Sequence, residues 1–91
     1  MEIEVGQMIT KNDGRIYLLM DKTIQNDKTY FLAAKLNEEQ EPTTDSHIFE
    51  LKEYDNEKYL VDVSDSKIIE LVSAIFVNKS YKKGLEGASL N

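Results

Sequence analysis

The chain has 91 residues, of which 41% are hydrophobic and 31% are charged, and its net charge at pH 7 is −6. A chain of this length buries only about 60–65% of the surface that its unfolded form exposes, which leaves room for one modest core. The mixed composition excludes a disordered chain. The absence of cysteine excludes a disulfide framework, a thiolate zinc site and a cysteine nucleophile. We therefore predict a single domain over residues 1–83, with residues 84–91 as a flexible tail.

The sequence shows no signal for export or for membrane insertion. The N-terminal residues Met1–Val5 lack the basic start and the apolar run of a signal peptide. The longest apolar stretch, Ile68–Val77, is about half as long as the roughly 20 residues that span a bilayer. Since the lack of cysteine also fits a reducing compartment, we expect a cytoplasmic protein with no membrane partner.

The N-terminal part of the chain has the pattern of antiparallel strands. Apolar residues recur at every second position, and residues that favour turns separate the runs. Ile3 and Val5 predict a first strand. The Asn-Asp-Gly reversal at 12–14 then leads into a second strand at 15–24, because these residues tolerate the positive φ of a tight turn.

Three further strands follow. The strand at 29–36 is apolar on both faces, so we place it in the middle of the sheet with cover on both sides. Residues 37–45 predict a polar, mobile loop. The fourth strand covers about His47–Tyr54, and the turn at 55–57 leads into the fifth strand at 58–63.

After residue 63 the period changes to that of a helix. Ser64 or Ser66 can cap its start, and Asp65 lies where the positive end of the helix dipole favours a carboxylate. We expect the helix to end near Tyr81, with Gly84 as the stop. The side chains that share one helical face are Ile68, Ile69, Leu71, Val72, Ile75 and Phe76.

These elements predict an α+β fold. It consists of a five-stranded antiparallel sheet, strongly twisted or partly closed like a small barrel, and of one C-terminal helix packed across an open face of the sheet.

No set of residues shows the spacing of a known catalytic or ligand-binding site. The single histidine, His47, has no serine or carboxylate at a triad spacing, so we interpret it as a solvated or hydrogen-bonded residue at a strand end. No glycine opens the helix to cradle a phosphate. Asp62 and Asp65 could bind Mg²⁺ weakly, but helix capping by the acid is the simpler interpretation. We predict no cofactor, no metal and no catalysis. The alternative is a metal-dependent hydrolase centred on His47, Asp62 or Asp65.

The charge distribution disfavours direct binding to nucleic acid. Affinity for nucleic acid comes chiefly from basic residues that release counterions. The only basic cluster, Lys79, Lys82 and Lys83, lies at the end of the predicted helix, where it interacts favourably with the helix dipole and adds solubility. We expect no direct nucleic-acid partner.

The acidity is concentrated in residues 37–57, NEEQEPTTDSHIFELKEYDNE. This segment carries eight carboxylates and one lysine, a net charge of −7, whereas the rest of the chain carries +1. One interpretation is that these acids keep the domain soluble and block aggregation between sheets. The other is a recognition surface for a basic protein partner. The candidate partner-binding residues are Glu38, Glu39, Glu41, Asp45, Glu50, Glu53, Asp55 and Glu57.

The order of strand and turn types resembles a known family. Residues 6–78, from GQMITKNDGRIYLLMDKTIQNDKTYFLAAKLNEEQE to HIFELKEYDNEKYLVDVSDSKIIELVSAIF, look like the YrzB-like family of small, acidic, uncharacterised proteins from Gram-positive bacteria. The similar features are a long second strand, a hairpin of the Asn-Asp-Lys-Thr-Tyr type, an acidic loop, and an Asp-rich entry into a helix that ends in Phe76. The resemblance implies a bacterial or phage source and a fold, and it carries over no functional residue.

We therefore predict a non-catalytic binding protein that acts through contact with another protein. An alternative is an inhibitor of a nucleic-acid-binding enzyme, such as a phage anti-defence or immunity protein. Such an inhibitor would imitate DNA if the strand at 47–54 and the turn at 55–57 aligned their carboxylates in a row. A homodimer is a further expectation, through Val77 and an exposed edge at Ile3–Val5.

Overall fold

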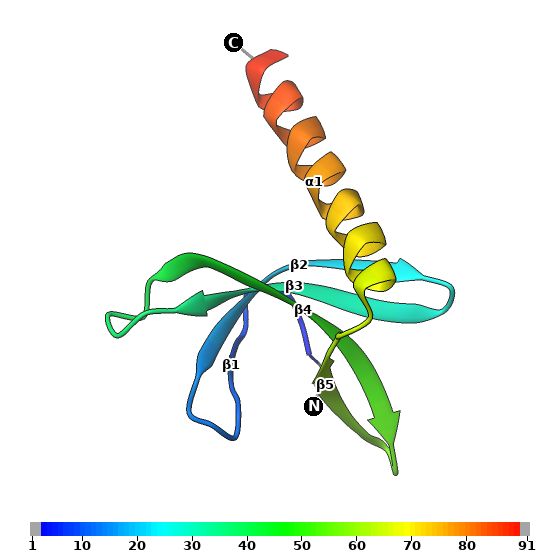
Figure 1. Cartoon of the computed structure of the whole chain (residues 1–91). Helices are drawn as coiled ribbons and strands as arrows, with labels where there is room; N and C mark the ends of the chain where they lie inside the picture. The colour runs from blue at the N-terminus through cyan, green and yellow to red at the C-terminus, as the bar shows by residue number, and fades with distance from the viewer. Residues whose placement is uncertain (1–2, 90–91) are drawn as a thin grey trace.

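The computed structural model describes residues 3–89, and the side chains of residues 3–79. The described residues form five β-strands and one α-helix (Figure 1). The elements are β1 Met8–Thr10, β2 Ile16–Gln25, β3 Lys28–Leu36, β4 Pro42–Tyr54, β5 Glu57–Asp62 and α1 Ser66–Ser89.

The strands form one antiparallel sheet in the order β1-β2-β3-β4-β5, as a series of consecutive hairpins. The sheet curls strongly, so that β1 and β5 turn toward each other without pairing, as in half of a barrel (Figure 1). β3 lies at the centre, as its two apolar faces predict. The predicted α+β architecture, with a partly closed sheet and one C-terminal helix, is confirmed.

Two of the reversals are two-residue turns made of Asn and Asp. The φ angles are 52° at Asn26 and 64° at Asp27 in the β2–β3 turn, and 52° at Asp55 and 64° at Asn56 in the β4–β5 turn. Positive φ at both central positions matches the right-handed twist of the flanking strands. Each turn therefore fixes the register of its two strands next to the turn.

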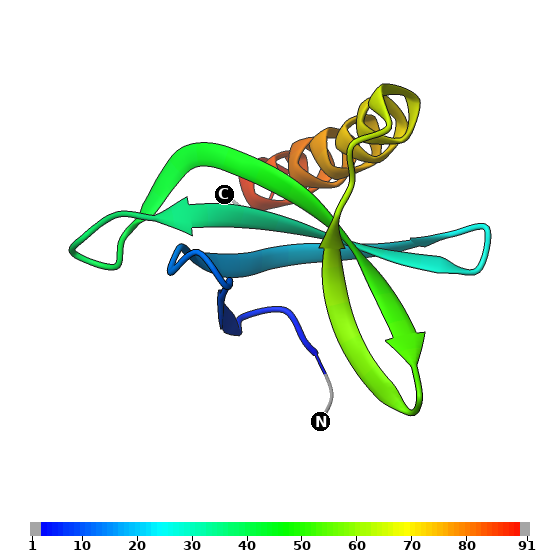
Figure 2. The ribbon, with the colours of Figure 1, turned by 60° about the horizontal axis from the view of Figure 1, so that its bottom comes forward.

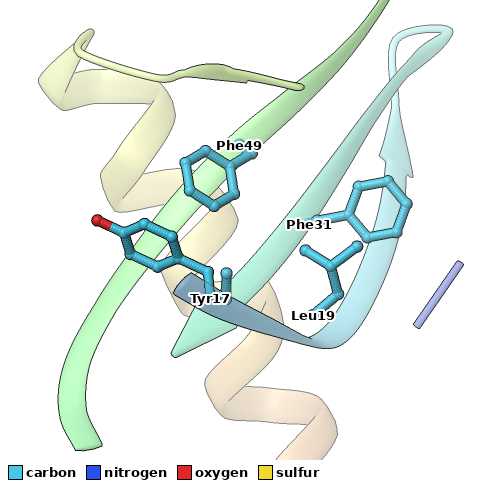
Figure 3. Packing of buried hydrophobic residues seen from close by; sticks show 5 residues of the cluster. Tyr17, Leu19, Phe31 and Phe49 are labelled. Carbon is cyan, nitrogen blue, oxygen red and sulfur yellow. The ribbon is translucent and has the colours of Figure 1, made fainter. Parts of the chain in front are cut away.

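One core lies on the concave face of the curled sheet (Figure 3). Its buried side chains come from β2, β3 and β4, and the rings of Tyr17 and Phe49 meet edge to face with their centroids 5.3 Å apart. The buried members of this core are Tyr17, Leu19, Phe31, Ala33 and Phe49.

The N-terminal segment covers this concave core instead of forming a strand. Gly6 has φ of 95° and turns the chain before β1, and Ile3 packs against the core. The first strand therefore lies at Met8–Thr10, and the prediction of a strand at Ile3–Val5 is wrong.

A second core lies on the opposite face, between the sheet and α1. Its buried members are Tyr30, Ile48, Val72 and Phe76, and Leu32, Val63 and Ile68 pack around them. Figure 2 shows the helix and the N-terminal segment on opposite faces of the sheet. The predicted cover on both faces of β3 is therefore confirmed.

Asp65 caps the start of α1. Its Oδ1 accepts a hydrogen bond from the N–H of Lys67 at 2.9 Å, and its backbone C=O accepts the first helical bond, from Ile69, at 3.0 Å. These are the two bonds of an N-cap residue. The cap is therefore the aspartate between the two predicted serines, Ser64 and Ser66.

The helix extends farther than predicted. It continues through Gly84 to Ser89, so the predicted end near Tyr81 is wrong and most of the predicted tail at 84–91 is helical. Residues 90–91 lie outside the described residues. A glycine inside a helix costs only about 1 kcal/mol relative to alanine, which does not force a stop.

A register shift in β2 brings a carboxylate to the helix. The pairing of β2 with β3 slips by one residue before Asp21, which places Asp21 opposite Leu32, on the helix side of the sheet. There Lys79 Nζ donates to Asp21 Oδ1 at 2.8 Å and to the C=O of Lys22 at 2.7 Å. Lys79 therefore connects the helix to the sheet, whereas the sequence assigns it to the helix end.

The predicted loop at 37–45 is shorter in the structure. β4 begins at Pro42. Proline has no backbone N–H to donate to a neighbouring strand, but it is tolerated as the first residue of a strand. Thr43 Oγ1 donates to the C=O of Lys35 at 2.7 Å and holds the new strand beside β3. Only residues 37–41 remain as the connection.

Candidate functional site

The connection between β3 and β4, Asn37–Glu41, is hereafter called the acidic turn. Asn37 holds its backbone, because its Oδ1 accepts hydrogen bonds from the N–H of Glu39 at 3.0 Å and of Glu41 at 2.9 Å. The N–H of Asn37 also donates to the C=O of Glu41 at 3.0 Å. The side chains of Glu38, Glu39 and Glu41 are exposed. The turn therefore displays three carboxylates on a backbone that hydrogen bonds fix.

A groove of about 510 Å³ lies between the acidic turn and the start of β2. Its charged lining consists of Glu38 and Asp45, which are two of the predicted site residues, and of Arg15 and Lys35. The local field in this groove is therefore mixed, and the strongly negative surface is the outer side of the turn.

His47 lies inside β4, on the concave face. The predicted position at a strand end is wrong, because β4 begins at Pro42. The imidazole meets the ring of Tyr17 at a centroid distance of 4.9 Å and is nearly parallel to that of Phe49 at 6.3 Å. Its Nε2 lies 3.1 Å from Asp45 Oδ1 without the alignment of a hydrogen bond. Among the described residues this buried nitrogen has no hydrogen-bond partner.

Glu50 lies on the other face of β4, beside the helix. It is opposite Tyr30 in the strand pairing, and its Oε2 is 3.5 Å from Lys52 Nζ. Burial raises the pKa of Tyr30 above its ordinary value of 10.0, and the neighbouring Glu50 carboxylate raises it further. Glu50 is thus partly buried and paired, and it offers little charge to a partner.

The last three candidates, Glu53, Asp55 and Glu57, lie at the β4–β5 turn, and residues 53–57 are hereafter called the hairpin tip. All three are exposed. β4 has 13 residues, which corresponds to a length of about 40 Å, and it separates the hairpin tip from the acidic turn (Figure 1). Six of the eight candidates therefore form two exposed groups at opposite ends of one strand, and the other two, Asp45 and Glu50, lie between these groups.

The strand between the two groups does not display a row of carboxylates. Glu50 and Glu53 are three positions apart along a regular strand, so they point to opposite faces of the sheet. The row of carboxylates that imitation of DNA would require is interrupted at this point.

The three residues considered for catalysis do not meet in one centre. Asp62 forms an ion pair with Lys11, Asp65 caps α1, and His47 packs between aromatic rings. Within residues 3–89, no group of three or more His, Cys, Asp or Glu side chains is arranged to hold a metal ion.

The two edges of the sheet face each other across a groove that sequence reasoning missed, hereafter called the seam groove. It has a volume of about 380 Å³. Its apolar lining comes from residues far apart in the chain, and Lys11 reaches across it to Asp62 while lying 5.1 Å from the centroid of the Phe49 ring. Prominent lining residues are Ile3, Ile9, Lys11, Phe49, Lys58 and Leu60. No local pattern reveals such a groove, because it depends on the curl of the whole sheet.

Comparisons of the chain with protein-family models, with curated proteins and with solved structures found no significant match. No helix in the described part of the chain has both the length and the apolar character that a membrane span requires.

Proposed function

We propose that the protein is a non-catalytic binding protein that contacts a basic surface of another protein. The observation that carries the proposal is that six of the eight candidate carboxylates are exposed and form no ion pair with a described residue. A concentrated negative field accelerates the encounter with a positively charged partner and selects against other partners.

Of the two exposed groups, the acidic turn is the better recognition element. The bonds of Asn37 hold its backbone in one conformation before a partner arrives, so binding loses less conformational entropy. Lys52 and Lys58 flank the hairpin tip on either side and reduce its local charge. We therefore assign recognition to Glu38, Glu39 and Glu41.

The separation of the two groups provides a matched test. One variant, E38Q/E39Q/E41Q, neutralises the acidic turn, and the other, E53Q/D55N/E57Q, removes the same charge from the hairpin tip. Affinity capture from a bacterial lysate, at low and moderate salt, should recover a partner with the wild type and with the tip variant. The turn variant should lose that partner, and salt should weaken its binding to the wild type. If both variants retain the same proteins as the wild type, the acids serve solubility alone.

The inhibitor alternative is distinguished by competition. A captured nucleic-acid-binding enzyme should release this protein when DNA is added, if the carboxylates occupy its phosphate site. Binding of both at once removes that alternative. Membership of the YrzB-like family, a bacterial or phage source and a cytoplasmic location stay predictions that the identity of the partner would inform.

A further inference from the structure

We propose that the free edge of β5 pairs with β5 of a second copy of this chain to form a symmetric dimer. β5 pairs with β4 on one side, and no strand of the described residues pairs with its other side. In a hairpin with a two-residue turn, the strand pair next to the turn is hydrogen-bonded, and bonded and unbonded pairs then alternate. The N–H and C=O groups of Lys58, Leu60 and Asp62 therefore point outward, and the bond from Val63 N–H to Ile48 C=O at 3.1 Å fits this alternation.

The concave face of β5 is complementary to itself. Lys58, Leu60 and Asp62 share this face, with the leucine in the middle and opposite charges at equal distances on either side. In an antiparallel pair related by a twofold axis, Leu60 lies opposite Leu60 of the partner subunit. Lys58 then lies opposite Asp62 of the partner subunit, and Asp62 opposite the partner's Lys58. Opposite charges that face each other across strands stabilise the pairing, whereas like charges destabilise it.

The other face of β5 matches in the same register. Tyr59 and Val61 are 40% and 41% exposed although both are large and apolar. The twofold axis at Leu60 places Tyr59 opposite Val61 of the partner subunit, and an aromatic side chain opposite a β-branched one is a favourable strand pair. One register therefore pairs the charges on one face and covers apolar surface on the other.

The alternative registers lack this match. A shift by two residues places Lys58 opposite Leu60 of the partner subunit, which leaves a charge against an apolar side chain. Edge strands that avoid pairing commonly carry charges that would repel a second copy. β5 instead carries one lysine and one aspartate symmetrically about a leucine, so its pattern fits a second copy better than an unrelated strand. This edge differs from the predicted dimer surface, because Ile3–Val5 do not form an edge strand.

The test is a charge exchange followed by sedimentation equilibrium at moderate salt. The wild type should have twice the monomer mass of 10.5 kDa at high concentration. Lys58→Asp and Asp62→Lys each create two like-charge pairs and should weaken the dimer about tenfold or more, whereas the double variant K58D/D62K should restore it. Lys11→Ala is the matched control, since it removes the ion pair with Asp62 but leaves the edge of β5 intact. It should remain dimeric.

A cysteine at the twofold axis gives a second measurement that does not depend on affinity. The chain contains no cysteine, and opposite residues in a hydrogen-bonded pair have Cα atoms about 5.5 Å apart, within the range of a disulfide. Leu60→Cys should therefore form a covalent dimer on oxidation, and Ile24→Cys, on an exposed position of β2, should not. A wild type that stays monomeric at all concentrations, or a Leu60→Cys variant that is folded but does not crosslink, overturns the proposal and leaves this edge to a strand of another protein. Neither result bears on the acidic turn, so the two proposals fail independently.

Discussion

The Nζ of Lys79 in α1 lies 2.8 Å from Oδ1 of Asp21 in β2, although 58 positions separate the two residues. The one-residue slip in β2 makes this contact, because without it Asp21 would point to the concave face. The same ammonium group lies 5.6 Å from the centroid of the Phe76 ring. The ion pair thus closes one side of the core between helix and sheet.

Removal of this ion pair should loosen the helix. Lys79→Ala should lower the free energy of unfolding by about 0.5–1 kcal/mol, a modest value because the lysine side chain is 37% exposed and solvent screens the pair. Urea denaturation measures the change. Lys67→Ala removes an exposed lysine of the same helix whose side chain forms no ion pair with a described residue, and it should have a smaller effect. Equal effects would show that Lys79 contributes only through the general charge of the helix.

Loss of the helix cap should be more costly. Asp65→Ala leaves the N–H of Lys67 without its acceptor, which should reduce stability by about 1 kcal/mol, whereas Asp65→Asn keeps a capping oxygen and should retain most of it. Thermal or urea denaturation distinguishes the two. If Ser64→Ala, on the neighbouring exposed position, costs as much as Asp65→Ala, the serine contributes to the cap.

Stability should fall above pH 10 because of Tyr30. Burial and Glu50 raise its pKa in the folded state above 10.0. Below pH 10 both the folded and the unfolded chain keep the phenolic proton, and the contribution of Tyr30 to stability is fully present. As the pH rises through 10, the unfolded chain releases this proton first, and the folded state is destabilised. Urea denaturation from neutral pH to just above pH 10 should show a steeper loss for the wild type than for Tyr30→Phe. Tyr54→Phe, at a position that is 69% exposed, should keep the wild-type slope.

The acidic turn should lose its fixed backbone when Asn37 is replaced. Asn37→Ala removes the acceptor of two backbone N–H groups, and we expect a loss of about 1 kcal/mol because water replaces these bonds in part. Amide hydrogen exchange at Glu39 and Glu41 should become faster. Asn37→Asp keeps an acceptor oxygen and should preserve slow exchange. If exchange is unchanged in the alanine variant, the strands on either side hold the turn without Asn37.

Much of the fold was predictable from local patterns. The alternation in β3 and β5, the apolar character of β3 on both faces and the Asn-Asp turns depend on neighbours along the chain, and the structure confirms them. The predicted elements are wrong where another interaction in the folded chain outweighs the local pattern. Ile3 and Val5 alternate as in a strand, but Gly6 turns the chain and Ile3 gains more by covering the concave core. Pro42, which suggests a loop, is tolerated as the first residue of a strand.

The sequence by itself determined that the charge is concentrated in residues 37–57, and that one sheet and one helix form. The tertiary structure decided how those charges are distributed in space. The length of β4 separates the acidic turn from the hairpin tip, and the slip in β2 directs Asp21 to the helix. The curl of the sheet brings Lys11 to Asp62 and forms the seam groove. These arrangements depend on strand register and on twist accumulated over the whole sheet, and long-range contacts set both.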